Sequence, residues 1–264
     1  MQILKQLSSI IKIVRPKHIL NAVISPLHTA KVFKYHYRRV SEKTFVEFMA
    51  NKWSRLPEEV GEAYLSYENN NMLWQEIMEK ISIYPRGYAL QMTKECSTLY
   101  LLMRLLRPEY IIETGVSAGV SSTYILQALN DNEMGKLYSI DLPPDNLPEG
   151  KPSGWVVPQH LRDRWTLHVG DSRNLLEPLL KKLTKIDCFI HDSLHTYDHM
   201  MWEFRIAWNY LSQGGLFLCH DVGANDAFLD FLNEKGIPWS DYRVFHVLGG
   251  FKKTESFLAR KSGT

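Results

Sequence analysis

The chain has 264 residues, of which 45% are hydrophobic and 23% charged, as in an ordinary globular protein with a full core. No apolar run reaches the roughly 20 residues that span a bilayer, and the first residues lack the apolar core of a secretory signal. The three cysteines are scattered, in the pattern of neither a disulfide framework nor a zinc site. We therefore expect a cytoplasmic protein with free thiols and no transmembrane segment.

The net charge of +2 is distributed unevenly along the chain. Residues 1–43 hold nine Lys and Arg against one acidic residue, so the remainder is net acidic. A basic segment that also carries isoleucine and leucine could rest peripherally on an anionic membrane or dock on a partner. The plainer interpretation is a helical extension that packs on its own domain or on a second subunit of a homo-oligomer. We expect no nucleic-acid partner.

Two domains are predicted from the change in sequence pattern. Residues 1–90 should form a helical and irregular extension, since several prolines interrupt it. From residue 91 to 264 the pattern becomes regular and predicts one larger domain. Its first helix is expected over Lys94–Leu106, where leucine and methionine recur at helical spacing.

Short apolar runs then alternate with helical segments, which predicts crossover units and a parallel sheet. The expected strands are Tyr110–Glu113, Lys136–Asp141, Trp165–Val169, Ile186–His191 and Gly215–His220, and the expected helices are Ser121–Asn130, Pro158–Asp163, Arg173–Leu183 and Thr196–Leu211. Two last runs, Tyr242–Val247 and Glu255–Arg260, are joined through Leu248-Gly-Gly250 by too short a link for a crossover helix. They should pair as an antiparallel hairpin. The fold class is thus α/β, with a seven-stranded, mostly parallel sheet and helices on both faces.

The loop after the first strand is the expected ligand site, because open α/β sheets bind ligands beyond the carboxyl ends of their strands. Residues 113–119 read Glu-Thr-Gly-Val-Ser-Ala-Gly. Gly115 permits a tight turn, and Gly119 lets the next helix start close to a ligand. Ser121 or Ser122 could help cap that helix, and Ser122 is also expected to take part in binding the cofactor. An ordinary strand-to-helix turn is the plain alternative.

Two cofactors compete for this loop. A nicotinamide dinucleotide needs glycine where Ser117 stands and again at the last position of the pattern, which is Val120. S-adenosylmethionine has no phosphate and so needs neither glycine. Its ammonium group would be attracted by the carboxylate of Glu113. The loop therefore favours S-adenosylmethionine.

Acidic residues at the next two strand ends extend the predicted cofactor site. Asp141 ends the second strand, 22 residues after Gly119, where a carboxylate accepts both ribose hydroxyls. Asp171 and Ser172 follow the third strand, and a carboxylate there can accept a hydrogen bond from the adenine amino group. Asp171 is equally suited to cap the helix that follows.

Asp192 and Asp221 follow the fourth and fifth strands. If these strands are neighbours, the two carboxylates converge and repel unless a cation lies between them. A magnesium-like ion would satisfy them and would lower the pKa of an acceptor hydroxyl. His195 is a candidate general base, or a group that orients a ligand carboxylate. The alternative is that both aspartates only cap loops.

The segment 143–159 is long and rich in proline and glycine, which is typical of a lid or binding surface. Trp155 within it could cover the adenine or the acceptor. An inert surface loop explains the composition equally well.

Together these residues resemble the class I O-methyltransferases over about residues 93–260. The similarity is greatest to the metal-dependent branch with catechol, caffeoyl-coenzyme A and macrocin O-methyltransferases and the cephalosporin-hydroxylase-like proteins. The motifs that carry it are Glu-Thr-Gly-Val-Ser-Ala-Gly at 113–119, Ile140-Asp141, Gly170-Asp171-Ser172 and Phe-Ile-His-Asp-Ser-Leu-His-Thr-Tyr at 189–197. The chain departs from the branch at the third metal ligand. Val222 stands where the catechol type has asparagine, and His220 stands where macrocin-like members have an acid.

The resemblance implies an S-adenosylmethionine-dependent O-methyltransferase (Rossmann-like fold) that acts on a small hydroxylated acceptor, a sugar or a secondary metabolite. The implied cofactors are S-adenosylmethionine and Mg²⁺, with His220 completing the metal site beside Asp192 and Asp221. Two alternatives stay open: an oxidoreductase on a dinucleotide fold, and a non-catalytic partner protein that docks through its basic segment.

Overall fold

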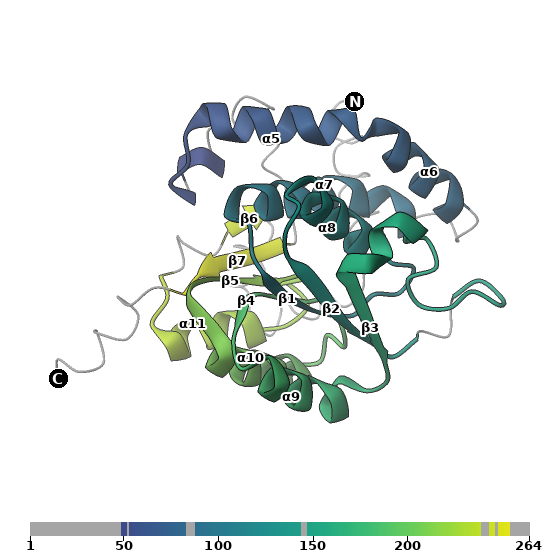
Figure 1. Ribbon diagram of the computed structural model, residues 1–264. Helices are drawn as coiled ribbons and strands as arrows, with labels where there is room; N and C mark the ends of the chain where they lie inside the picture. Colours follow the sequence, from purple (N-terminus) through teal and green to yellow (C-terminus); the bar gives the residue numbers. More distant parts are fainter. Residues whose placement is uncertain are drawn as a thin grey trace, which may run out of the picture.

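The computed structural model describes residues 49–51, 53–82, 88–143, 147–238, 243–245 and 248–253. The basic segment 1–43 and the predicted strand Glu255–Arg260 lie outside these residues. In the described part, a central sheet is covered by helices on both faces (Figure 1). Helices α7 and α8 lie on one face, and α9, α10 and α11 lie on the other, while α5 and α6 form an outer layer over α7 and α8.

The elements follow the predicted alternation closely. The helices are α5 Pro57–Asn69, α6 Asn71–Ile81, α7 Tyr88–Leu106, α8 Val120–Asp131, the 3₁₀ helix η1 Gln159–Arg164, α9 Ser172–Leu183, α10 Tyr197–Tyr210 and α11 Ala227–Lys235. The strands are β1 Tyr110–Thr114, β2 Lys136–Asp141, β3 Trp165–Val169, β4 Ile186–His191, β5 Leu211–Cys219, β6 Arg243–Phe245 and β7 Leu248–Lys252.

The strand order is β3-β2-β1-β4-β5-β7-β6, with β1 to β5 parallel. Strand β7 runs antiparallel to both β5 and β6. The predicted α/β fold is confirmed. Because the chain winds outward in both directions from β1 and β4, the order reverses between these two strands, and ligands bind at such a reversal.

The end of the domain differs from the prediction in two places. Residues expected to form a turn, Leu248-Gly-Gly250, belong to β7. A Cβ at Gly249 would collide with Val222 and Phe228, so the absence of a side chain lets this strand lie against β5. Helix α11 was not predicted at all. It buries Phe228, Phe231 and Leu232 on one face, at helical spacing.

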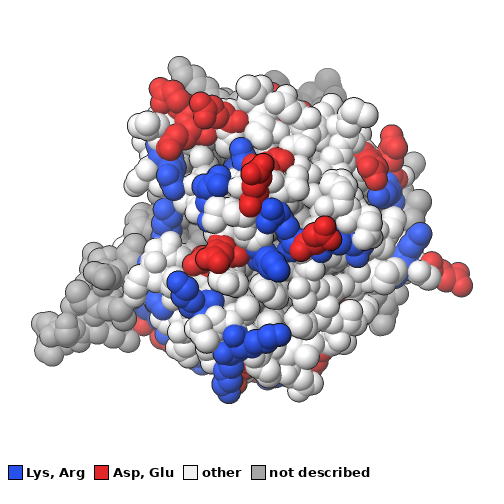
Figure 2. All heavy atoms as spheres, viewed as in Figure 1, with Lys and Arg blue, Asp and Glu red and all other residues white. Residues whose placement is uncertain are grey.

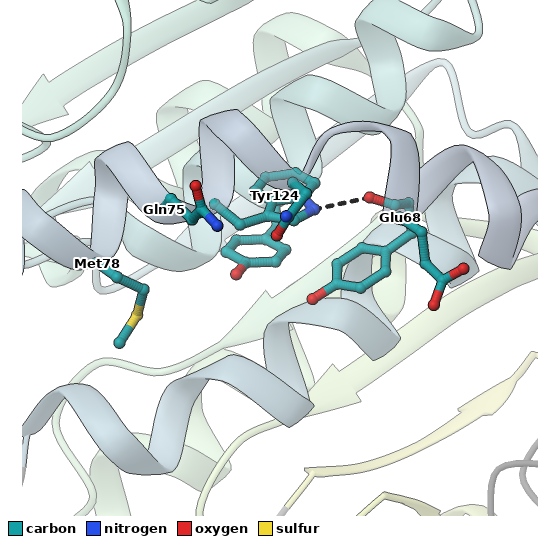
Figure 3. A pocket seen from close by; sticks show the side chains of 7 residues that line it. Glu68, Gln75, Met78 and Tyr124 are labelled. Carbon is teal, nitrogen blue, oxygen red and sulfur yellow. Dashed lines mark hydrogen bonds between the residues drawn. The ribbon is translucent and has the colours of Figure 1, made fainter.

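Helices α5 and α6 share one core with α7 and α8. Trp74 of α6 stacks on Tyr124 of α8, with ring centroids 4.1 Å apart. Its indole nitrogen donates to the Tyr67 carbonyl at 2.8 Å, the dashed line in Figure 3. A hollow of about 470 Å³ opens beside these rings and is lined by Tyr67, Glu68, Asn71, Trp74, Gln75, Met78 and Tyr124 (Figure 3). These aromatic contacts fix the outer helices on the domain.

Charges of both signs are mixed over the face seen in Figure 2. Acidic side chains gather at the upper left of this face. Across the described part of this face, no extended surface of one sign forms. Among the described helices, none combines the length and apolar composition that crossing a membrane requires.

Candidate active site

The site lies at the carboxyl edge of the sheet, where the loops after β1, β2, β4 and β5 meet. The backbone of Gly115 touches that of Asp192 so closely that a Cβ would collide with the Asp192 carbonyl. Gly115 also has φ +88°, which glycine adopts without strain. The predicted cofactor loop and the predicted catalytic aspartate are therefore direct neighbours.

Asp141 holds the loop from the side of β2. One carboxylate oxygen accepts the amide N–H of Val116 at 2.8 Å and of Ser117 at 3.3 Å. Ser117 adopts φ +52°, and its buried hydroxyl has no hydrogen-bond partner in the described structure. Gly119 precedes α8 with φ +92°. Asp141 and the loop are thus arranged together as predicted, with a hydroxyl left over for a ligand.

Glu113 corrects one prediction. It is fully buried and points between β2 and α8, where its oxygens accept hydrogen bonds from Ser121, Ser122 and Ser139 at 2.6 to 2.8 Å. Neither Glu113 nor the Ser122 hydroxyl is available to a cofactor. Burial raises the pKa of Glu113 to about 7, because the three hydroxyls offer hydrogen bonds but no positive charge.

The residues after β3 take different roles. Asp171 caps α9, since it accepts the Arg173 amide N–H at 2.8 Å, and it stays exposed at the edge. The capping alternative is therefore confirmed, while the adenine contact stays a prediction. Ser172 is buried, and its hydroxyl donates to Glu203 at 2.7 Å. That hydroxyl cannot reach a cofactor, which corrects its predicted role.

The proline- and glycine-rich segment lies on the cofactor loop. Gly154 N–H donates to the Ser117 carbonyl at 2.8 Å, and Val156 N–H donates to the Ala118 carbonyl at 3.1 Å. The hydroxyl of Ser153 donates to the second carboxylate oxygen of Asp141. Trp155 is partly buried against the core rather than open at the edge. The segment therefore covers the loop and occupies the carboxylate that a ribose would need.

Three side chains meet at the ends of β4 and β5. Asp192 Oδ1 lies 3.0 Å from Nδ1 of His220 and 3.7 Å from Nε2 of His195. About a quarter of each side chain is exposed. Burial alone would raise the pKa of Asp192, but the neighbouring histidines, His220 first, hold it below its usual value. Burial lowers the pKa of His195, although the carboxylates of Asp192 and Asp221 oppose this effect.

These three residues could hold a metal ion, because one donor atom from each lies within 4.8 Å of the others. Asp221, predicted as the second carboxylate ligand, is outside this trio. Asp221 adopts φ +51° directly after β5. Its carboxylate is still close enough to raise the pKa of His195, so its role as a metal ligand stays a prediction.

A buried network beneath the trio was not predicted. Glu203 of α10 is fully buried and accepts hydrogen bonds from Thr114 at 2.6 Å and Ser172 at 2.7 Å, besides meeting two imidazoles. Its oxygens lie 2.7 Å from His191 Nδ1 and 2.9 Å from His199 Nε2. Burial is outweighed by these partners, which strongly lower the pKa of Glu203. A charged residue between apolar neighbours on α10 was the available signal.

The part of the chain that forms this site matches one protein family model. Residues 112–222 match a family model described as a methyltransferase domain. The match begins in β1 and ends just after Asp221. It therefore contains the predicted cofactor loop and the trio of Asp192, His195 and His220. Comparison with curated protein sequences gives no match.

Comparison with solved structures gives matches of low sequence identity. The SAH-bound methyltransferase PaMTH1 of Podospora anserina is 16% identical, with a TM-score of 0.51 over 69% of this chain and 88% of that one. A putative O-methyltransferase of Klebsiella pneumoniae is 15% identical, with a TM-score of 0.47 over 73% and 89%. TomG of Streptomyces achromogenes, an O-methyltransferase in complex with SAM, is 20% identical, with a TM-score of 0.41 over 56% and 62%. The likeness to PaMTH1 agrees with the class I methyltransferase fold predicted from the sequence.

Proposed function

We propose that the protein transfers the methyl group of S-adenosylmethionine to a hydroxyl of a small molecule. The observation that carries this proposal is the backbone contact between Gly115 of the predicted cofactor loop and Asp192 of the trio. This contact supports the proposal, because the predicted cofactor loop and a carboxylate suited to act on a hydroxyl are neighbours at the sheet edge. The matched methyltransferase domain supports the class of reaction, and the SAH bound to PaMTH1 supports the cofactor.

The described residues fit the cofactor. Asp141 would accept the ribose hydroxyls once Ser153 moves aside, and the unpartnered hydroxyl of Ser117 would bind the methionine half. Leu142, Val169 and Leu194 follow or end three strands and are 57 to 67% exposed, which gives the adenine and the acceptor an apolar surface. Gly115 and Gly119 let the loop lie against Asp192 and Gly154, because a Cβ at either glycine would collide with those backbones.

Methyl transfer needs mainly positioning, because the sulfonium is already activated. The acceptor oxygen bonds to the methyl carbon as the carbon–sulfur bond breaks and its electrons stay on sulfur. The hydroxyl proton passes at the same stage to a base, the role that we assign to the imidazole of His195. We propose that Asp192 and His195 act on that hydroxyl, since both are partly exposed beside the loop.

A divalent ion at Asp192 and His220 is part of the proposal, because their donor atoms lie 3.0 Å apart. When bound, such an ion lowers the pKa of a hydroxyl that it contacts. The dinucleotide alternative is disfavoured by Ser117, which stands where a pyrophosphate needs glycine. Its carbonyl is also bonded to Gly154.

Binding of S-adenosylhomocysteine tests the proposal without knowledge of the acceptor. At a concentration 100 times its Kd, the ligand should raise the free energy of unfolding by about 2.7 kcal/mol. In a chain of this size that is a rise in Tm of about 5 to 10 °C. NAD at the same concentration should give no rise. Stabilisation by NAD without stabilisation by S-adenosylhomocysteine would overturn the proposal.

A further inference from the structure

The trio of Asp192, His195 and His220 has the geometry of a preformed metal-binding face. Metal–ligand bonds of about 2.1 Å place neighbouring donors about 3.0 Å apart in an octahedral shell and about 3.4 Å apart in a tetrahedral one. The distances from Asp192 Oδ1 are 3.0 Å to His220 and 3.7 Å to His195. The donor atoms of the two imidazoles lie within 4.8 Å of each other, so the rings would move together slightly as they close on one ion.

The backbone holds the three donors in place from separate elements. The Asp192 amide donates to the Thr114 carbonyl at 2.8 Å, and the His220 amide donates to the His191 carbonyl at 2.8 Å. The side-chain amide of Asn225 donates to the His195 carbonyl at 3.1 Å. Nε2 of His195 is buried and has no hydrogen bond within the described structure. A donor atom that faces the carboxylate without its own partner is what a metal ligand requires.

The donor types decide which ion fits. Mg²⁺ prefers a shell of oxygen atoms, whereas imidazole suits Zn²⁺, Fe²⁺, Co²⁺ and Ni²⁺. Two imidazoles and one carboxylate on one face leave positions open for a substrate oxygen. We infer that Asp192, His195 and His220 bind a first-row transition-metal ion in preference to Mg²⁺. This inference rests on the proposed function, in which the same site acts on the acceptor hydroxyl.

The inference also changes the role of His195. An imidazole nitrogen that binds the ion has no lone pair left to accept a proton. His195 would then hold the ion and could not also serve as the base, so the proton of the acceptor hydroxyl would pass to solvent. Macrocin-like members have an acidic residue where this chain has His220. The inference explains this difference, because His220 supplies the second imidazole ligand.

Metal binding to chelator-treated protein tests this directly. Calorimetric titration should show Co²⁺ and Zn²⁺ binding about 100-fold or more tightly than Mg²⁺. The visible absorption of bound Co²⁺ gives a second readout that does not depend on activity. Comparable affinities for Co²⁺ and Mg²⁺ would overturn the inference.

Matched variants locate the site. His220→Gln and His195→Gln keep the side-chain size and should each weaken Co²⁺ binding at least about 10-fold and change its absorption spectrum. His220→Glu replaces nitrogen by oxygen and should narrow the preference for Co²⁺ over Mg²⁺. His160→Gln, an exposed histidine in η1, is the control and should change nothing. Unchanged Co²⁺ binding in both trio variants, or an equal loss in the control, would contradict the assignment.

The same samples separate the two proposals. S-adenosylhomocysteine binding with no preference for transition metals would refute this inference and leave the proposed function intact. Selective metal binding without S-adenosylhomocysteine binding would refute the proposed function instead.

Discussion

Two buried glutamates lie beneath the two halves of the site, and they differ in their partners. Glu113 lies under the cofactor loop and receives three serine hydroxyls. Glu203 lies under the acceptor half and meets two histidines as well as hydroxyls. Both side chains are fully buried. The pKa of Glu113 is raised to about 7, while that of Glu203 is strongly lowered.

The difference shows what decides the charge of a buried carboxyl. Hydroxyls donate hydrogen bonds but carry no charge, so burial dominates at Glu113. Histidines can supply positive charge, so they outweigh burial at Glu203. The cofactor half is therefore close to neutral beneath its loop. The acceptor half keeps a charged network that supports His191, whose ring meets that of His195 at 5.2 Å.

The largest effect is expected from removing the charge of Glu203. Glu203→Gln should lower the free energy of unfolding at pH 7 by about 3 to 5 kcal/mol, because an amide cannot accept all the hydrogen bonds that Thr114, Ser172 and the two imidazoles direct at the buried carboxylate. Urea denaturation measures the change. Glu234→Gln is the control, since its ion pair with Arg205 is exposed and should be worth about 1 kcal/mol or less. Equal small losses in both variants would mean that the network carries no net charge.

The pH dependence of stability should show whether Glu113 is protonated in the folded state. In the folded state it keeps its proton up to about pH 7, whereas the unfolded chain loses it near pH 4.5. The folded state thus binds more protons in this window, and its stability falls as the pH rises through it. Glu113→Gln should remove this contribution, on the order of 3 kcal/mol between pH 4.5 and 7. Parallel stability curves of the two proteins would show that Glu113 is ionised when folded.

A smaller effect is expected at Ser153, whose hydroxyl occupies Asp141 in place of a ribose. Ser153→Ala removes this competitor and should tighten S-adenosylhomocysteine binding several-fold, on the order of 1 kcal/mol. Calorimetric titration measures it, with Ser212→Ala at the start of β5 as the control. Weaker binding in Ser153→Ala would mean that this serine holds the closed segment over the cofactor.

The sequence was sufficient for the sheet, because hydrophobic periodicity and chain alternation fix which strands are parallel. It also placed Asp141, Asp192 and His195 at one edge, since residues that end parallel strands share that edge. The sequence did not predict strand β7, because the pair of glycines at 249 and 250 is typical of a turn. They allow close packing against Val222 and Phe228 instead.

Side-chain direction was harder to predict than position. Along β1, Ile111 and Glu113 face the core under α7 and α8, while Ile112 and Thr114 face α10. A glutamate at the strand end therefore points into the core rather than toward the cofactor. The alternation of side chains along a β-strand could have predicted this direction from the sequence. The left-handed backbone at Asp221 and the approach of His195 to Asp192 depend on tertiary contacts that a sequence pattern does not encode.

The central claim is that, at the carboxyl edge of the sheet, Asp141 serves the cofactor and Asp192 serves the acceptor. Titration of S-adenosylhomocysteine tests this claim most directly. Asp141→Asn should weaken binding about 10- to 100-fold, since it removes the charge from the hydrogen bonds to the ribose. Asp192→Asn should leave the Kd within about threefold of the wild type while it removes metal binding. Equal effects of both variants on S-adenosylhomocysteine, or no effect of Asp141→Asn, would contradict the account.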